Sequence, residues 1–246
     1  MAIEAGATIL GLVSAMPSGP GVIDEALIAS IASGVSAQTF LLTSLSAADA
    51  IATRHQRCNT TAIQICDALP PGDLTQLRRA RPGVRLVQVI HVTGDASYDE
   101  AMRAAAEADA LLLDSGNPSL SIKELGGTGR THDWRVSHRI CASAGIPVFL
   151  AGGLNPDNVA EALATTGATS VTECGRAERW IERSSSGSSP PCVSASIVRV
   201  SDELPEADRL TEALREELDR RLDAYYADPA SARPWREIKE ELFGAK

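Results

Sequence analysis

The first 172 residues alternate between two hydropathy patterns, short apolar runs and longer amphipathic stretches rich in alanine. The apolar runs predict strands at 8–15, 39–44, 62–66, 85–92, 110–115, 147–153 and, more weakly, 169–173. The amphipathic stretches predict helices near 23–34, 46–57, 72–80, 97–108, 133–144 and 157–166. Because strand and helix follow each other strictly and the strands are apolar on both faces, the pattern predicts a parallel α/β sheet with helical crossovers.

The pattern changes after about residue 183. The stretch SSSGSSPPCVSAS is rich in serine, glycine and proline, which is typical of a flexible linker. Beyond it, leucines recur at four-residue spacing on an acidic background and predict a helix with one apolar stripe: Leu210, Leu214, Leu218 and Leu222. The predicted domains are a barrel-like domain over 1–183, a linker over 184–200 and an acidic helical tail over 201–246.

Composition and charge exclude several classes of protein. A net charge of −9 leaves no basic stripe for nucleic acid. No run approaches the roughly 20 apolar residues that cross a bilayer, and the first residues lack the basic region of a signal peptide, so we expect no membrane partner. The 5 cysteines are scattered without a CxxC pair, which favours reduced thiols in the cytoplasm over a disulfide frame or a metal site.

Asp114 is the first candidate for chemistry, because it ends the apolar run ALLLD. In parallel barrels the carboxyl ends of the strands converge on the active site. A carboxyl group at that place can act as a general acid when its surroundings keep it protonated. The alternative is a structural role in which Asp114 caps the following loop. Position alone does not favour one over the other.

Two glycine clusters follow. Gly126, Gly127 and Gly129 lie in ELGGTGRTHDW, where an ordinary turn is favoured over an anion cradle. In PVFLAGGLNPDNV, a strand ends at Gly152 and Gly153, and Asn155 can cap the next helix. We favour a phosphate site over a simple tight turn at this junction, because the second glycine is not needed for the cap.

His91 and Cys66 also end predicted strands. His91 has no second metal ligand near it in the sequence, so a packing role is favoured. For Cys66 a buried free thiol is the default interpretation.

The three blocks LLLDS, GGTGRTHDW and PVFLAGGLNPDNV together resemble phosphoribosylanthranilate isomerase, an enzyme of tryptophan biosynthesis. Weaker similarity in AIQICD and GATILGLVSAMPSGPGVIDEALI extends the resemblance over about residues 1–172. The resemblance implies a (β/α)8 TIM barrel that lacks strand 1 and is altered at strand 8. It also implies an isomerase that acts on a small phosphorylated sugar–anthranilate without metal or cofactor.

The resemblance implies a role for each matching residue. Asp114 would be the general acid that protonates the ribose ring oxygen in an Amadori rearrangement. Gly152 and Gly153 would belong to the phosphate site, and Gln64 would line the mouth of the barrel. The loop beside the acid would be shaped by the glycines of GGTG: Gly126, Gly127 and Gly129.

The chain also departs from the family. The strand with the catalytic cysteine, expected before MAIEAGA, is absent from the sequence, and the loop MPSGPGVIDE lacks the usual arginine. The segment CGRAERW replaces the usual strand-eight phosphate loop, and His132 stands where phenylalanine is usual. We therefore expect impaired activity and an open barrel edge that favours self-association. The alternative function is a non-catalytic one, either a phosphosugar-binding barrel or an antitoxin-like partner protein that acts through the C-terminal tail.

The tail has a fainter resemblance of its own. The segment LTEALREELDRRLDAYYADPASARPWREIKEEL resembles antitoxin components of addiction modules. This resemblance implies a toxin partner for residues 201–246. The alternative is a solvated helical extension that docks on its own barrel.

Overall fold

The computed structural model describes residues 8–14, 16–17, 22–125, 129–155 and 157–171, and the backbone of 197–199. The strands are β1 (Ile9–Val13), β2 (Gln38–Thr43), β3 (Ala62–Ile65), β4 (Arg85–His91), β5 (Ala110–Asp114), β6 (Val148–Leu150), β7 (Ser170–Val171) and β8 (Ile197–Arg199). The helices are α1 (Glu25–Gly34), α2 (Ala48–Cys58), α3 (Asp73–Ala80), α4 (Ala96–Ala105), α5 (Trp134–Ser143) and α6 (Val159–Thr166). The predicted alternation of strand and helix is confirmed from β1 to β7.

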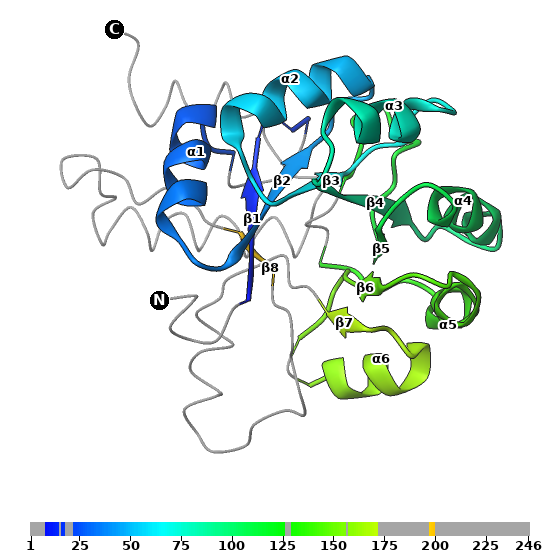
Figure 1. The fold of residues 1–246 in the computed structure, drawn as a ribbon. Coiled ribbons are helices and arrows are strands. Elements are labelled where there is room, and N and C mark those ends of the chain that lie inside the picture. Colours follow the sequence, from blue (N-terminus) through cyan, green and yellow to red (C-terminus); the bar gives the residue numbers. More distant parts are fainter. Residues whose placement is uncertain are drawn as a thin grey trace, which may run out of the picture. The chain divides into compact units, whose positions relative to one another are not determined.

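The strands form one parallel sheet in which neighbours in sequence are neighbours in space. The order is β7-β6-β5-β4-β3-β2-β1-β8, and every pairing between these strands is parallel. The sheet curls, and helices α1 to α6 follow its outer side (Figure 1). The predicted parallel α/β architecture is confirmed. Among the described residues no pairing joins β7 to β8, so the sheet order is open.

The outer edge of β1 has a partner that the sequence did not predict. Residues 197–199, which fall in the predicted linker, form β8 and pair with β1 from Ile9↔Ile197 to Gly11↔Arg199. The resemblance places a preceding strand at this same edge. Strand β1 therefore has neighbours on both sides, and self-association through an open edge stays a prediction. The predicted tail over 201–246 lies outside the described residues.

Residues alternate between an inner and an outer face along the strands, as the strand period of two requires. The inner face is built from Ile9, Val13, Phe40, Leu42, Ala62, Cys66, Val87, Val89, Ala110 and Leu112, with Leu125 and Ala151. The outer face packs against the helices with larger aliphatic side chains such as Leu41, Ile63 and Leu111. This alternation also puts the side chains of Gln64, His91 and Asp114 on the inner face.

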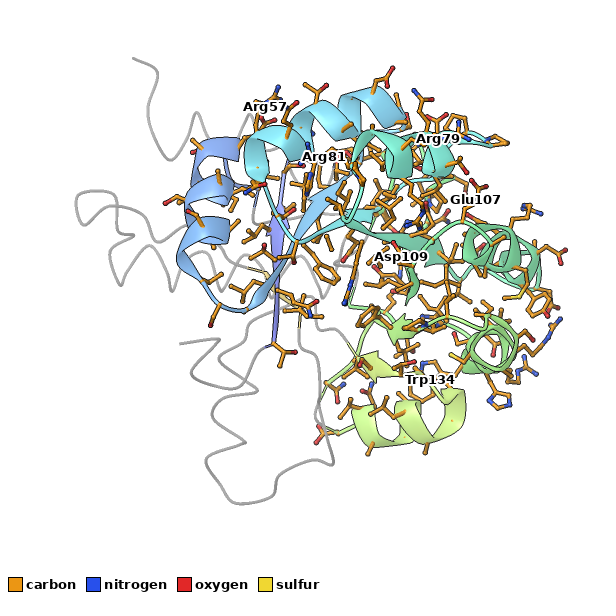
Figure 2. The ribbon with its side chains drawn as sticks, in the orientation of Figure 1. Arg57, Arg79, Arg81, Glu107, Asp109 and Trp134 are labelled. Carbon is orange, nitrogen blue, oxygen red and sulfur yellow. The ribbon has the colours of Figure 1, made fainter. Side chains whose placement is uncertain are left out.

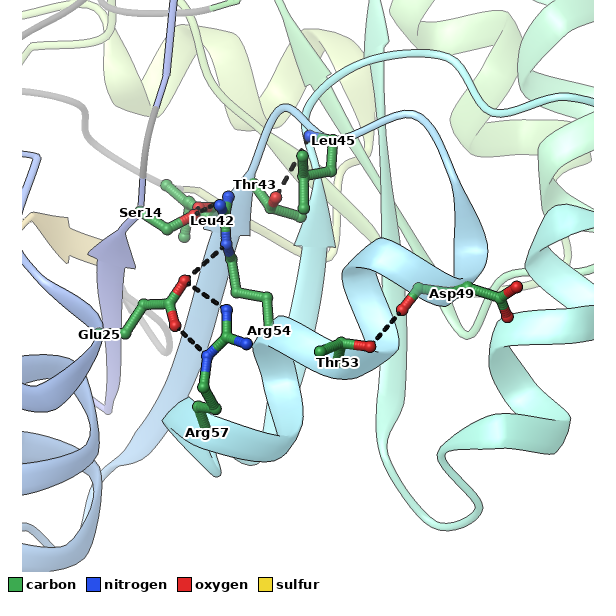
Figure 3. Close-up of polar contacts among 9 residues, drawn as sticks. All are labelled: Ser14, Glu25, Leu42, Thr43, Leu45, Asp49, Thr53, Arg54 and Arg57. Carbon is green, nitrogen blue, oxygen red and sulfur yellow. Dashed lines mark hydrogen bonds and ion pairs between the residues drawn. The ribbon is translucent and has the colours of Figure 1, made fainter.

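Polar contacts join the outer helices to one another and to the sheet. Glu25 at the start of α1 forms ion pairs with Arg54 and Arg57 of α2 (Figure 3). The side chain of Arg54 also lies 3.5 Å from the hydroxyl of Ser14, which donates to the carbonyl of Leu42 at 2.9 Å. Ion pairs that keep contact with solvent contribute little to stability, so the buried aliphatic clusters hold the helices on the sheet.

Candidate active site

Asp114 lies at the carboxyl end of β5, on the inner face of the sheet, with a side chain that is almost fully buried. Its Oδ1 accepts a hydrogen bond from the backbone N–H of Ser115 at 2.7 Å. In the sheet register Asp114 pairs with His91 of β4. The capping contact that the sequence analysis considered therefore exists, and the same geometry presents the carboxyl group at the end of the sheet where parallel barrels carry their active sites.

Several buried polar atoms without a hydrogen-bond partner occur on the inner face of the sheet and at the start of α5. Among the described residues these side-chain atoms are Gln64 Oε1, His91 Nδ1, His132 Nδ1 and Trp134 Nε1. Gln64 and His91 face inward at the carboxyl ends of β3 and β4, and His132 interacts electrostatically with Asp114. Such atoms are few in native proteins, and each calls for an explanation. The unpartnered amide oxygen of Gln64, on the inner face near the carboxyl end of β3, supports a binding site at this end of the sheet.

Gln64 is buried near the end of β3, and its role at the mouth of the barrel stays a prediction. Its amide nitrogen lies 3.8 Å from Cys66 Sγ, while its amide oxygen has no partner. The Cys66 thiol in turn points to the Gln64 carbonyl at 3.7 Å. Cys66 is buried within the inner core, which agrees with the default interpretation of this thiol as a packing group.

His91 supports the loop that follows Asp114. Its Nε2 lies 2.9 Å from the Cys66 carbonyl oxygen, so Nε2–H is the donor. The other edge of the ring lies against Gly116, where an added Cβ would come within 2.4 Å of both His91 Nδ1 and the Glu124 carbonyl oxygen. The packing role that the sequence favoured for His91 is confirmed. Gly116 is a residue that the sequence analysis missed, because only the fold brings it against this ring.

The turn at Gly152 and Gly153 has a structural explanation that the sequence did not supply. Both residues have positive φ, +83° and +62°. A Cβ on Gly152 would lie 2.9 Å from the backbone N of Ser115, and one on Gly153 would lie 2.5 Å from the carbonyl carbon of Arg130. The second glycine is therefore required by close packing, and the argument that it implied a ligand was incomplete. The phosphate role of both glycines stays a prediction.

The predicted N-cap at Asn155 is wrong, because the N-cap of α6 lies three residues later at Asn158, without a side-chain cap bond. Asn155 instead closes the turn that precedes the helix. Its side-chain oxygen accepts from the backbone N–H groups of Asp157 at 2.8 Å and Asn158 at 3.2 Å. The Asn158 amide donates to the carbonyl of Gly153 at 3.0 Å, which ties the glycine turn to the start of α6. The helix dipole of α6 is thereby oriented with its positive end toward the turn.

The GGTG loop is described only in part. Gly129 has φ +66° and no atom within 4 Å of the position of an added Cβ, so its conformation alone favours glycine. Gly126 and Gly127 lie outside the described residues, and their predicted role stays untested.

Two ion pairs anchor the loop between β5 and α5, and the sequence analysis missed both. Lys123 pairs with Asp67, which is largely buried just after β3. Arg130 pairs with Glu124 within the loop. The loop therefore reaches past the end of β4 to the end of β3. A carboxylate directly after a strand, at Asp67, was the only sequence signal for this contact.

The described residues contain no group of three or more His, Cys, Asp or Glu side chains that could hold a metal ion. Burial raises the pKa of the Cys58 and Cys141 thiols to about 11, so both are protonated at neutral pH. In the same part of the chain, no helix has both the length and the apolar character needed to cross a membrane.

Solved structures of phosphoribosylanthranilate isomerases share this fold. The enzyme from Thermus thermophilus matches with a TM-score of 0.59 and 20% identity, over 75% of this chain and 91% of that chain. The enzyme from Thermotoga maritima matches with a TM-score of 0.59 and 20% identity, over 70% and 79% of the two chains. At these identities the likeness concerns the fold alone.

A sequence model of addiction module components matches residues 196–238, which agrees with the predicted resemblance of the tail. These residues lie outside the described part of the chain except for β8. The toxin partner that this resemblance implies stays a prediction.

Curated relatives match the barrel-like part of the chain. The N-(5'-phosphoribosyl)anthranilate isomerase of Methanocella arvoryzae is 39% identical over 123 residues, which are 50% of this chain and 55% of the relative. That of Haloarcula marismortui is 33% identical over 166 residues, 66% of this chain and 73% of the relative. The chain thus spans about half the length of the first relative and almost three quarters of the second.

The site and the comparisons agree on the same part of the chain. The sequence model of N-(5'-phosphoribosyl)anthranilate isomerase matches residues 43–172, which include Gln64, Asp114 and the turn at Gly152 and Gly153. The parallel sheet, the buried carboxyl group at the end of β5 and these matches lead to one conclusion, that the chain belongs to the phosphoribosylanthranilate isomerase family.

Proposed function

We propose that the chain catalyses the Amadori rearrangement of N-(5-phosphoribosyl)anthranilate, the isomerase step of tryptophan biosynthesis. The observation that carries this proposal is the buried carboxyl group of Asp114, held on the inner face of the sheet at the carboxyl end of β5. Unpartnered polar atoms of Gln64 and His132 at the same end of the sheet support a binding site there.

Asp114 is the proposed general acid. Its Oδ1 is engaged by the N–H of Ser115, so Oδ2 is the oxygen available to carry the working proton. Transfer of this proton to the ribose ring oxygen breaks the bond between that oxygen and C1. The electron pair of the anthranilate nitrogen then forms the C=N bond of the open-chain intermediate. General acid catalysis of this kind contributes about 10²–10⁴-fold in rate.

The turn at Gly152 and Gly153 is the proposed phosphate site, and Gln64 the proposed mouth residue. Support comes from the helix dipole of α6, which begins after this turn and favours a bound anion. A related structure, 17% identical to this chain, was solved in complex with reduced 1-(o-carboxyphenylamino)-1-deoxyribulose 5-phosphate. We further propose that the curled sheet belongs to a (β/α)8-type barrel in a cytoplasmic protein that works without a cofactor.

The test is turnover of phosphoribosylanthranilate by the purified full chain, followed by the loss of substrate fluorescence. Asp114→Asn keeps the shape of the side chain and an acceptor for Ser115 but has no acidic proton. We expect kcat/KM to fall by about 10²–10⁴-fold in this variant.

Asp109→Asn is the matched control. Asp109 immediately precedes β5 (labelled in Figure 2), and its Oδ2 accepts from the backbone N–H of Leu86 at 2.7 Å. This contact survives in the amide. The amide loses the ion pair of Asp109 with Arg78, but a pair this exposed contributes little to stability, so the control variant should retain the activity of the unmodified chain. An unmodified chain that converts substrate no faster than buffer rejects the isomerase proposal. Tight binding of the substrate without turnover would instead favour a non-catalytic phosphosugar-binding barrel.

A further inference from the structure

The loop that follows Asp114 is folded back on itself over residues 115–125, which we call the acid loop. At its start, the backbone N–H of Ser115 donates to Asp114 Oδ1 at 2.7 Å. Further along, Asn117 and Glu124 form an antiparallel bridge, in which the N–H of Glu124 donates to the carbonyl of Asn117 at 3.1 Å. The position of the acid loop therefore determines where the N–H group that orients the Asp114 carboxyl lies.

Three contacts fix the acid loop on the sheet. Near its start, Gly116 packs against the ring of His91. At its end, Leu125 is buried in the core on the inner face. Between them, the ammonium group of Lys123 forms an ion pair with Asp67, just after β3. The first two contacts are close packing, whereas the third joins opposite charges and can be removed by a substitution that keeps the size of the side chain.

The two partners of this ion pair differ in their exposure to solvent. The side chain of Asp67 is 10% exposed and that of Lys123 is 47% exposed. Asp67 is fixed to its own segment, because its Oδ1 accepts from the N–H of Ala68 at 2.9 Å and its carbonyl accepts from the amide of Gln88 at 3.1 Å. A carboxylate that is nearly buried is costly unless a counter-charge accompanies it. In the described part of the chain the acid loop supplies that counter-charge through Lys123.

We propose that Lys123 is a positioning residue for Asp114. By pairing with Asp67 it holds the acid loop closed on the sheet, and with the loop it holds the N–H of Ser115 that orients the acid. This inference rests on the proposed isomerase function. Lys123 touches no reacting atom. When its charge is lost, Asp67 is left nearly buried without a counter-charge, and the loop opens because opening lets water reach that carboxylate.

The difference in exposure makes the two halves of the ion pair unequal. Lys123→Gln leaves the charge of Asp67 in a nearly buried place, so the acid loop must open to hydrate it. Asp67→Asn removes that charge and keeps an acceptor for the N–H of Ala68, while the lysine that remains is already half exposed. Lys123→Gln should therefore loosen the loop more than Asp67→Asn. Lys123→Arg keeps a positive charge at this place and should hold the loop closed.

The first measurement is amide hydrogen exchange of the acid loop in the full chain, which does not depend on activity. At the hydrogen-bonded amides of Ser115 and Glu124, Lys123→Gln should speed exchange by about tenfold, and Asp67→Asn by about threefold or less. Glu124→Gln is the matched control, because it breaks the more exposed pair with Arg130 and keeps the backbone bridge. Its exchange at Ser115 should be unchanged. Exchange in Lys123→Gln that is no faster than in Asp67→Asn would overturn the inference.

The second measurement separates kcat from KM for phosphoribosylanthranilate. Lys123→Gln should lower kcat by about tenfold, because small displacements of a catalytic group are costly, and should change KM by less than about threefold. Lys123→Arg should restore most of kcat, which a merely structural role of the side chain would not require. An unchanged kcat in Lys123→Gln despite faster exchange would overturn the positioning role. If the unmodified chain shows no turnover, the isomerase function fails, and the exchange measurement by itself decides whether Lys123 holds the acid loop.

Discussion

Replacement of Gly153 by alanine tests the close packing between the end of β6 and the loop that carries His132. The added Cβ would lie 2.5 Å from the carbonyl carbon of Arg130 and 2.6 Å from the backbone N of Thr131. Carbon atoms in contact are normally about 3.5–4.0 Å apart. Because both neighbours are backbone atoms, the variant can relieve the overlap only by moving one segment away from the other.

The size of the effect follows from two separate costs. Gly153 has φ +62°, and an L-residue in the left-handed region costs about 1–2 kcal/mol. The loss of chain entropy in the unfolded state offsets about 0.4–1 kcal/mol of this. Overpacking adds about 1–3 kcal/mol. Gly129→Ala is the matched control, because Gly129 has φ +66° and no atom within 4 Å of the added Cβ.

We therefore expect Gly153→Ala to be less stable than Gly129→Ala by about 1–3 kcal/mol. Urea unfolding of both variants and the unmodified chain measures this difference directly, and a difference of about 2 kcal/mol corresponds to about 4–8 °C in Tm for a domain of this size. Gly153→Ala should also lower kcat/KM, because Gly153 belongs to the proposed phosphate site. Equal stability of the two variants would show that the close approach at Gly153 carries no energetic weight.

Two further predictions concern stability. Burial lowers the pKa of His55, which is held between the Arg81 side chain and the Thr60 carbonyl. As the pH falls, the unfolded chain therefore binds a proton near pH 6.5 before the folded chain does, and the free energy of unfolding should fall below that pH by up to about 1.4 kcal/mol per pH unit. Urea unfolding at several pH values should show a weaker pH dependence of this free energy in His55→Gln. An unchanged pH dependence would contradict this reasoning. In the core, Leu113→Ala should cost about 2–5 kcal/mol because the side chain is fully buried, whereas Ile122→Ala, at a side chain that is 68% exposed, should leave the unfolding midpoint almost unchanged.

The alternation of elements was predictable because it depends on local patterns. Apolar runs such as ALLLD are too short and too continuous for an amphipathic helix, and each is followed by an amphipathic stretch. The structure has strands and helices at all of these places, with ends that differ by a few residues. A local turn at Asn155 was also within reach of the sequence, but the helix cap itself lies at Asn158 and not at Asn155.

The sequence predicted where the candidate acid Asp114 lies, but not which residues surround it. The sequence put Asp114 at the end of a strand, and parallel topology puts that end at the functional mouth. The sequence also noted His132 as a departure from the family, without a role for it. Its contact with Ser137 is local, but the packing of its neighbour Thr131 against Gly153 depends on the folded sheet.

The sequence by itself determined the order of strands and helices, the inward-facing positions on each strand and the family to which the chain belongs. The tertiary structure alone decided why Gly152 and Gly153 have no side chains, which polar atoms are left without partners, and which residues close the outer edge of β1. The physical reason is the distance along the chain over which each kind of interaction acts. Propensity, hydropathy period and helix caps act between residues a few positions apart, whereas close packing and electrostatic pairing act between segments that only the folded sheet brings together.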